Sequence, residues 1–258
     1  SASPCQGEGR EFESRHPLYT NPGRLAGVIL VSMDAHDLLG TTLDPSTPET
    51  RAAMVMTLFG ALGRGGSSGA LGNDLDSELL QSLRAWADVV LVSASTVTAE
   101  DYGPADTSIA ILSRSLDLSP SLGVFSGREM IVACPEQSLI DDSFADRRRA
   151  LEQAGARFVS TGTGSLGEAV DALRSEGFHR IACEGGPSVY AAMIGADLLD
   201  VIHLTLDPTV SSDDSGWGLP AIAQQAEFAR RYALEGTHAA DDGTLFLRYR
   251  RAGDRSEY

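Results

Sequence analysis

The sequence predicts an α/β protein in which helices flank a mostly parallel sheet that ends in antiparallel strands. Short apolar runs of strand length alternate with segments whose apolar residues recur at helical spacing, as in βαβ units. The run at 25–32 is apolar until its last residue, as expected for a strand buried on both faces, and the run at 88–92 is another short apolar strand. Near the C-terminus, the stretches 232–238 and 244–250 flank a D-D-G turn, which favours an antiparallel pair.

The elements follow in order along the chain. The first expected strand is 25–32, and Thr47-Pro48-Glu49 then opens an expected helix that runs to about Leu62. The glycine-rich run at 63–69 is expected to be a mobile connector, with a functional lid as the alternative. The other expected strands are 88–92, 109–112, 130–134, 158–160, 179–183, 201–207, 232–238 and 244–250, and the other expected helices are 73–86, 143–155, 165–177 and 187–196.

Length and composition favour one globular domain. We expect a flexible arm at 1–23 and a single domain at 24–258 that carries an insertion, the helix and glycine-rich run, at about 43–69. No apolar run reaches the roughly 20 residues of a membrane span, and the arm lacks a signal-peptide centre. A soluble cytoplasmic protein is therefore expected.

Charge and cysteine content exclude several kinds of partner and site. The formal charge of −16 disfavours non-specific nucleic-acid binding, and the absence of lysine excludes Schiff-base and P-loop lysine chemistry. The three widely spaced cysteines fit neither a disulfide framework nor a zinc site, so no metal is expected. A small molecule is the expected ligand.

The stretch 179–200 holds the strongest candidate for a binding site. It is expected to form a strand, a turn at Gly185-Gly186 and a helix that begins at Pro187. The glycines leave the backbone amides at the helix start open to an anion, and Glu184 ends the strand at the edge where α/β sheets bind ligands. The alternative is an ordinary turn with a surface glutamate.

A second turn of small residues follows the strand at 88–92. The sequence Ser93-Ala94-Ser95-Thr96 offers hydroxyls and backbone amides that suit a second phosphate, and a short helical turn is expected there. Taken in order, the runs VSMD (31–34), LRAWADVVLVSASTVTAED (83–101), ILSR (111–114), EGGPSVYAA (184–192), DLLDVIHLTLDP (197–208) and LFLRYR (245–250) resemble the reductase domain of bacterial riboflavin biosynthesis, a dihydrofolate-reductase-like family. The resemblance spans roughly residues 24 to 250.

The resemblance implies that NADPH lies across the C-terminal edge of the sheet. The cofactor residues that it implies are Ser95, Thr96, Glu100, Ser113, Arg114, Gly185, Gly186, Pro187, Ser188 and Val189. Among these, Arg114 suits a 2′-phosphate, because a guanidinium matches phosphate geometry.

For the substrate, the resemblance implies Arg84, together with Ser32 and Asp34 in the stretch that the family usually reads as SLDG. It implies Glu184 as the catalytic residue, through proton transfer or by anchoring the pyrimidine. We expect Arg84 and Glu184 to face the ligand and not to pair with each other. The chain departs from the family at Val28, in SMDA, and in the lack of an arginine after Asp101.

Three interpretations follow. The first is an NADPH-dependent reductase of a phosphoribosylated diamino- or aminopyrimidine, with hydride transfer to the ribosyl C1′. The second is a reductase of another heterocycle, such as a pterin or dihydrofolate. The third is a non-catalytic nucleotide-binding homologue. The resemblance also implies a homodimer.

Overall fold

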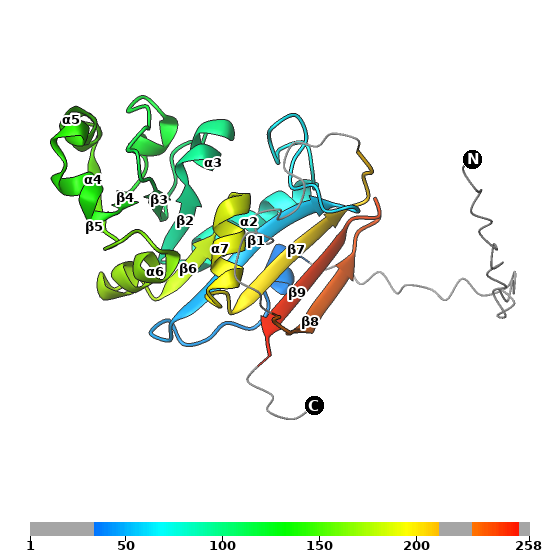
Figure 1. Cartoon of the computed structure of the whole chain (residues 1–258). Helices are drawn as coiled ribbons and strands as arrows, with labels where there is room; N and C mark the ends of the chain where they lie inside the picture. The colour runs from blue at the N-terminus through cyan, green and yellow to red at the C-terminus, as the bar shows by residue number, and fades with distance from the viewer. Residues whose placement is uncertain (1–33, 212–228, 253–258) are drawn as a thin grey trace, which may run out of the picture. The chain divides into compact units, whose positions relative to one another are not determined.

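The computed structural model describes residues 34–211 and 229–252, all within one compact unit that spans Ser32–Tyr258. In these residues nine strands form one sheet in the order β5-β4-β3-β2-β6-β1-β7-β9-β8 (Figure 1). The strands are β1 (Glu49–Thr57), β2 (Val89–Ser93), β3 (Ser108–Leu112), β4 (Met130–Cys134), β5 (Ala156–Ser160), β6 (Arg180–Cys183), β7 (Val201–Asp207), β8 (Tyr232–Ala239) and β9 (Leu245–Arg251). Neighbours from β5 to β7 are parallel, and β9 is antiparallel to both β7 and β8. The predicted fold class is confirmed.

One short helix precedes β1, and the other helices lie in the connections between strands. They are α1 (Ala35–Leu39), α2 (Asp74–Trp86), α3 (Ala94–Ala99), α4 (Glu136–Ile140), α5 (Ala145–Gln153), α6 (Leu166–Ser175) and α7 (Pro187–Gly195), with 3-10 turns η1 (Gly123–Ser126) and η2 (Asp142–Phe144). Residues at or near their N-termini determine where several of these helices begin. Asn73 caps α2, Ser165 and Glu168 form the predicted capping box of α6, and Pro187 is the first residue of α7.

The expected helix from Thr47 to Leu62 is wrong, because Glu49–Thr57 is strand β1. Its alanines and methionines favour helix locally, but β1 pairs with β6 on one side and β7 on the other. Burial in the middle of a sheet outweighs that weak local preference. The other expected early element, the strand at 25–32, lies outside the described residues, as do Ser32, Val28 and the expected arm.

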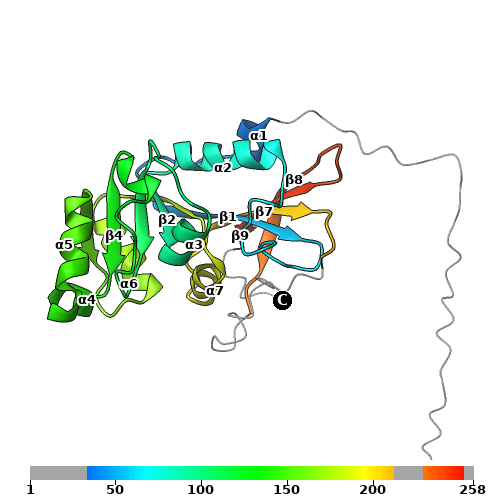
Figure 2. The same cartoon turned by 90° about the horizontal axis from the view of Figure 1, so that it is seen from above.

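The sheet separates two apolar cores. Val90 and Val92 of β2 pack with Leu79 and Leu83 of α2, whereas the alternate residues of β2 face the core that contains Val189. Figure 2 shows α2 on one side of the sheet and α7 on the other. The C-terminal ends of β2 and β6 lie side by side, so the segments that follow them meet at one edge. No helix in the described ranges is long and apolar enough to cross a membrane.

Candidate active site

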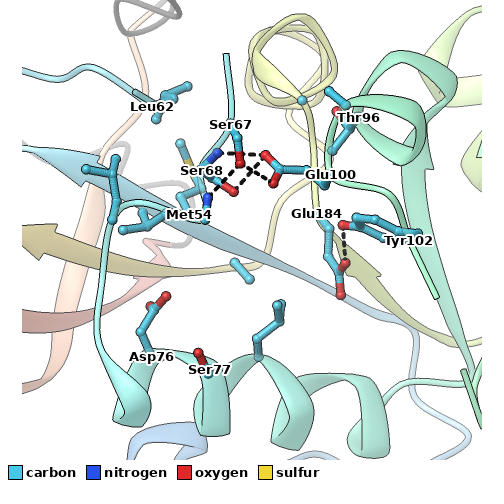
Figure 3. Close-up of a pocket in the computed structure, with 18 of the residues that line it drawn as sticks. Met54, Leu62, Ser67, Ser68, Asp76, Ser77, Thr96, Glu100, Tyr102 and Glu184 are labelled. Atoms are coloured by element: carbon cyan, nitrogen blue, oxygen red, sulfur yellow. Dashed lines mark hydrogen bonds between the residues drawn. The ribbon is translucent and has the colours of Figure 1, made fainter. Parts of the chain in front are cut away.

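A cavity of about 620 Å³ opens beside this edge (Figure 3). Its size lies within the roughly 300–1,000 Å³ that is usual for ligand pockets. Helix α2, the segment 62–71, the end of α3 and the start of α7 supply most of its walls, and β1 and β7 supply residues as well. The site therefore combines two segments that lie far apart in the sequence, 53–104 and 184–205.

The two turns predicted to hold the cofactor contact each other directly. The Gly186 amide donates to Ser93 Oγ at 3.3 Å, and Ser93 Oγ lies 2.8 Å from Thr96 Oγ1. A Cβ atom at Gly186 would lie 2.7 Å from Thr96 Oγ1, so no larger residue fits without displacing Thr96. The start of α7 therefore presents bare backbone beside the small side chains of α3.

Position 185 requires glycine for a different reason. Its φ of +79° favours glycine, and a Cβ atom there would lie 2.4 Å from the Tyr190 ring. Tyr190 is buried and its hydroxyl donates to the Ala53 carbonyl of β1. This contact holds α7 against β1.

Arg84 and Glu184 form a bidentate ion pair, which makes the expectation that they stay apart wrong. Arg84 Nε and Nη2 each donate to one carboxylate oxygen of Glu184 at 2.7 Å. The Tyr102 hydroxyl also donates to Glu184 Oε2 at 2.7 Å, and the Arg84 guanidinium lies 5.0 Å from the Tyr102 ring centroid. All three side chains line the cavity, so the pair is part of the pocket wall.

The contacts within this group keep Arg84 charged and Tyr102 neutral. Burial works against the charge on Arg84, but hydrogen bonding and the charge of Glu184 outweigh it and raise the pKa of Arg84. Burial, with help from Glu184, raises the pKa of the Tyr102 hydroxyl well above its usual value. Tyr102 therefore stays a hydrogen-bond donor at neutral pH. No pattern in the sequence predicted a role for Tyr102.

A second polar group, which the sequence did not predict, lies where α2 passes β7. Thr205 Oγ1 donates to Asp76 Oδ1 at 2.5 Å, and both residues line the cavity. Burial, and to a smaller degree the charge of Asp207, raises the pKa of the Asp76 carboxyl despite the bond from Thr205. In the sequence, Asp76 is one more acid in the first turn of a helix, so nothing marks it as a pocket residue.

His203 lies next to this group on β7 and also lines the cavity. It is 2% exposed, and its Nε2 has no hydrogen-bond partner among the described residues. Burial, followed by the charges of Arg51, Arg248 and Arg250, lowers its pKa to about 3. The imidazole is therefore neutral at physiological pH.

Glu100 contacts the glycine-rich run. Its carboxylate accepts hydrogen bonds from Ser67 Oγ and the Ser68 amide at 2.7 Å, and from Ser68 Oγ at 3.0 Å. Figure 3 shows this contact on the side of the pocket opposite Asp76 and Ser77. Residues of the run line the cavity, so the alternative of a lid has a structural basis.

The predicted cofactor residues divide into two groups. Those that line the cavity are Ser95, Thr96, Glu100, Gly186 and Pro187. Ser188 is exposed outside the lining, and Val189 packs into the apolar core because it falls on the inward face of α7. Neither Ser188 nor Val189 contributes a side chain to this cavity.

Ser113 and Arg114 follow β3, away from the cavity lining. Ser113 is buried, and its Oγ has no hydrogen-bond partner within the described ranges. Arg114 is exposed, and its Nη2 donates to the Gly164 carbonyl at 2.8 Å. Both residues lie at the same C-terminal edge of the sheet as the cavity, because β3 pairs in parallel with β2.

Asp34 is not at this site. It caps α1, where its Oδ1 accepts a hydrogen bond from the Asp37 amide at 2.9 Å, and it does not line the cavity. The strand that leads to the glycine-rich run is β1, which is followed by Leu58, Phe59 and Gly60. The described residues of SMDA, Asp34 and Ala35, are therefore not among the residues that line this cavity, and the role of this run stays a prediction.

The lining is acidic. It contains four carboxylates, those of Asp76, Glu100, Asp101 and Glu184, and Arg84 is the only lysine or arginine among the lining residues that the structure describes. That arginine is already paired with Glu184. Across the described residues, no group of three histidine, cysteine, aspartate or glutamate side chains is arranged to hold a metal ion.

The family model described as the RibD C-terminal domain matches residues 48–225, more than half of the chain. The chain belongs to this family. The match begins one residue before β1 and excludes the VSMD run at 31–34, in agreement with the position of β1 in the sheet. None of the curated proteins matches the sequence.

Solved structures show the same fold as this RibD C-terminal domain. A pyrimidine reductase-like protein from Corynebacterium diphtheriae has a TM-score of 0.73 and 26% identity, covering 86% of this chain and 100% of that one. The riboflavin biosynthesis reductase Rib7 of Saccharomyces cerevisiae has a TM-score of 0.60 and 16% identity, covering 83% and 94%. A deaminase/reductase from Thermotoga maritima, named for a phosphoribosylaminopyrimidine and a phosphoribosylaminouracil, has a TM-score of 0.63 and 16% identity, covering 80% and 57%.

Proposed function

We propose that this protein is an NADPH-dependent reductase that binds the cofactor across the turns after β2 and β6. The observation that carries the proposal is the contact between Gly186 and Thr96 beside the cavity, where a Cβ atom has no room. A bare helix start of this kind lets backbone amides approach a phosphate, and the helix dipole favours the negative charge. Membership of the RibD C-terminal domain family supports the same assignment.

The residues present fit a dinucleotide at this edge. Ser95, Thr96, Gly186 and Pro187 would hold its central part, and Gly185 would shape the turn beside them. The buried hydroxyl of Ser113, which has no partner among the residues that the structure describes, suits a hydrogen bond to the adenosine end. Arg114 would bind the 2′-phosphate that distinguishes NADPH from NADH. When bound, the cofactor supplies a hydride from nicotinamide C4.

On the substrate side, we assign roles to the two polar groups of the pocket. Arg84 and Tyr102 orient the Glu184 carboxylate, which we propose faces the reacting atoms as the acidic group. Asp76, oriented by Thr205, offers a buried carboxylate to the N–H donors of a nitrogen heterocycle. A carboxylate held between donors in this way keeps its orientation when a ligand binds.

The first substrate class that we propose is a phosphoribosylated diamino- or aminopyrimidine of riboflavin biosynthesis, reduced at the ribosyl C1′. The family and the names of the Thermotoga and yeast relatives support it. In line with the family resemblance, we also propose a cytoplasmic homodimer.

A second class, another heterocycle such as a pterin or dihydrofolate, is favoured by the acidic lining. Four carboxylates surround one arginine that already has a partner, and this arrangement repels a phosphate more than it attracts one. Asp76 would serve either class, because both carry N–H donors on a pyrimidine ring.

Two measurements on the purified chain test the proposal. Fluorescence titration with NADPH should show saturable binding, and absence of binding would remove the cofactor assignment. Oxidation of NADPH should then be followed at 340 nm with the phosphoribosylaminopyrimidine and, separately, with dihydrofolate. Turnover of only the first supports the riboflavin pathway, turnover of only the second supports the other heterocycle, and binding without turnover of either indicates a non-catalytic homologue.

A further inference from the structure

The glycine-rich run forms a strap beside the pocket, defined here as residues 63–69. Both ends of the surrounding segment are fixed to the sheet. The Ala61 amide donates to Thr57 Oγ1 at 3.0 Å, and the Gly72 amide donates to Asp207 Oδ2 at 2.8 Å. Gly60 and Gly72 adopt φ values of +85° and +77° at these ends, which only glycine adopts easily.

The middle of the strap is a tight reversal. The Arg64 amide donates to the Ser67 carbonyl at 2.8 Å, and the Ser67 amide donates back to the Arg64 carbonyl at 3.2 Å. The two residues between them are Gly65 and Gly66, with φ values of +60° and +87°. This turn sets the position of Ser67 and Ser68, both of which line the cavity.

Glu100 contacts the strap from the end of α3. It follows α3, and its amide donates to the Thr96 carbonyl at 2.9 Å, so its backbone belongs to the wall that carries the predicted cofactor turn. Its carboxylate accepts three hydrogen bonds from two consecutive strap residues, at 2.7, 2.7 and 3.0 Å (Figure 3). Hydrogen bonds to a charged acceptor are stronger than those between neutral groups.

We propose that Glu100 is a positioning residue that holds the strap closed over the pocket, and that ligands enter and leave when this contact opens. We call the contact of Glu100 with Ser67 and Ser68 the latch. The residue after α3 supplies the acceptor carboxylate, and a segment flanked by Gly60 and Gly72 supplies all three donors. This inference uses the proposed function only in choosing NADPH as a probe ligand.

The first test needs no ligand. The chain has no lysine, and Arg64 is the only arginine between Arg51 and Arg84, so trypsin cleavage after Arg64 yields an identifiable fragment. Arg64 is exposed, and opening of the strap should control its cleavage. Relative to wild type, Glu100→Ala should raise the cleavage rate at Arg64 at least about tenfold, which corresponds to about 1.4 kcal/mol.

Matched variants separate the latch from a general effect of charge. Asp101→Asn removes a neighbouring charge and should leave the cleavage rate unchanged. Glu100→Gln keeps one acceptor oxygen and should give an intermediate rate. The double variant Ser67→Ala/Ser68→Ala removes the two hydroxyl donors and keeps the Ser68 amide, so it should also raise the cleavage rate, but less than Glu100→Ala does. Equal cleavage in wild type, Glu100→Ala and the serine double variant would overturn the proposal, and a thermal melt would show that each variant is folded.

The second test measures NADPH dissociation by stopped-flow fluorescence. Glu100→Ala should release NADPH about tenfold faster and the serine double variant should release it faster by a smaller factor. The triple variant should be no faster than Glu100→Ala, because the serine hydroxyls have no acceptor left once the Glu100 carboxylate is gone. Additive effects would mean that Glu100 and the serines contact the ligand independently, and would overturn the latch. If wild type binds no NADPH, the proposed function fails while the cleavage assay still decides the inference.

Discussion

The guanidinium of Arg84 and the carboxylate of Glu184 form two parallel hydrogen bonds of 2.7 Å, which join α2 to the end of β6. The carboxylate is 3% exposed and the arginine 19% exposed, so water screens the pair only weakly. A buried carboxylate is costly unless a cation pairs with it, and Arg84 is the cation here. The pair is thus both part of the pocket and a structural link between a helix and the central sheet.

Replacing Arg84 should destabilise the protein. Arg84→Ala leaves a buried carboxylate without its cation, and we expect a loss of about 3–5 kcal/mol in the free energy of unfolding, measured in urea. The control is Arg157→Ala, which breaks ion pairs to Glu129 and Glu176 whose side chains are 38–44% exposed. It should cost about 0–1 kcal/mol. Similar small losses in both variants would show that the Arg84 pair is not structural.

Glu184→Gln should keep cofactor affinity and lower turnover. If the carboxylate takes part in proton transfer, the reduction should be roughly 10²–10⁴-fold in kcat. Tyr102→Phe is the matched control, because it removes one donor to Glu184 and keeps the ion pair. Full turnover in a folded Glu184→Gln enzyme would assign Glu184 a structural role only.

Gly186→Ala should weaken NADPH binding while the chain stays folded. The added Cβ would lie 2.7 Å from Thr96 Oγ1, and relieving that contact should cost about 1–3 kcal/mol in stability. Combining it with Thr96→Ala removes the obstructing oxygen, so the double variant should regain thermal stability without regaining affinity. Unchanged affinity in the folded single variant would argue against a cofactor at this turn.

Arg114→Ala should reduce affinity for NADPH more than for NADH. The expected difference is about 1.5–3 kcal/mol, as for a hydrogen bond to a charged group, and titration with both cofactors measures it. Arg149→Ala, which removes an exposed arginine that pairs with Asp146, should affect neither cofactor. Equal losses for NADPH and NADH in Arg114→Ala would transfer the role to Arg128 or Arg147.

His203 should make the protein sensitive to acid. Its folded pKa of about 3 lies below the ordinary value of 6.5, so only the unfolded chain binds this proton between those values. The stability that the neutral imidazole contributes is present above pH 6.5 and falls as the pH drops, by up to about 1.4 kcal/mol per pH unit. Urea unfolding of wild type and His203→Gln at pH 7 and 5 isolates this contribution. Parallel pH profiles for the two proteins would contradict it.

Several features of the fold and the site followed from sequence because their causes are local. The run at 88–92, the Gly185-Gly186 turn with Pro187 after it, and the capping box at Ser165 each depend on residues a few positions apart. Likewise, the D-D-G turn at 241–243 joins β8 and β9 as predicted. These signals, taken in order, also supported the family resemblance that the match over residues 48–225 confirmed.

The tertiary structure alone decided the rest. β1 is a strand because it lies between β6 and β7, although its alanines and methionines favour helix. Arg84 meets Glu184 across 100 positions of sequence, Asp76 meets Thr205 across 129, and Glu100 meets Ser68 across 32. Each contact is made by packing α2, α3 and the strap around one edge of the sheet. Local sequence determines which elements form, whereas burial and long-range hydrogen bonding determine which charges end up paired.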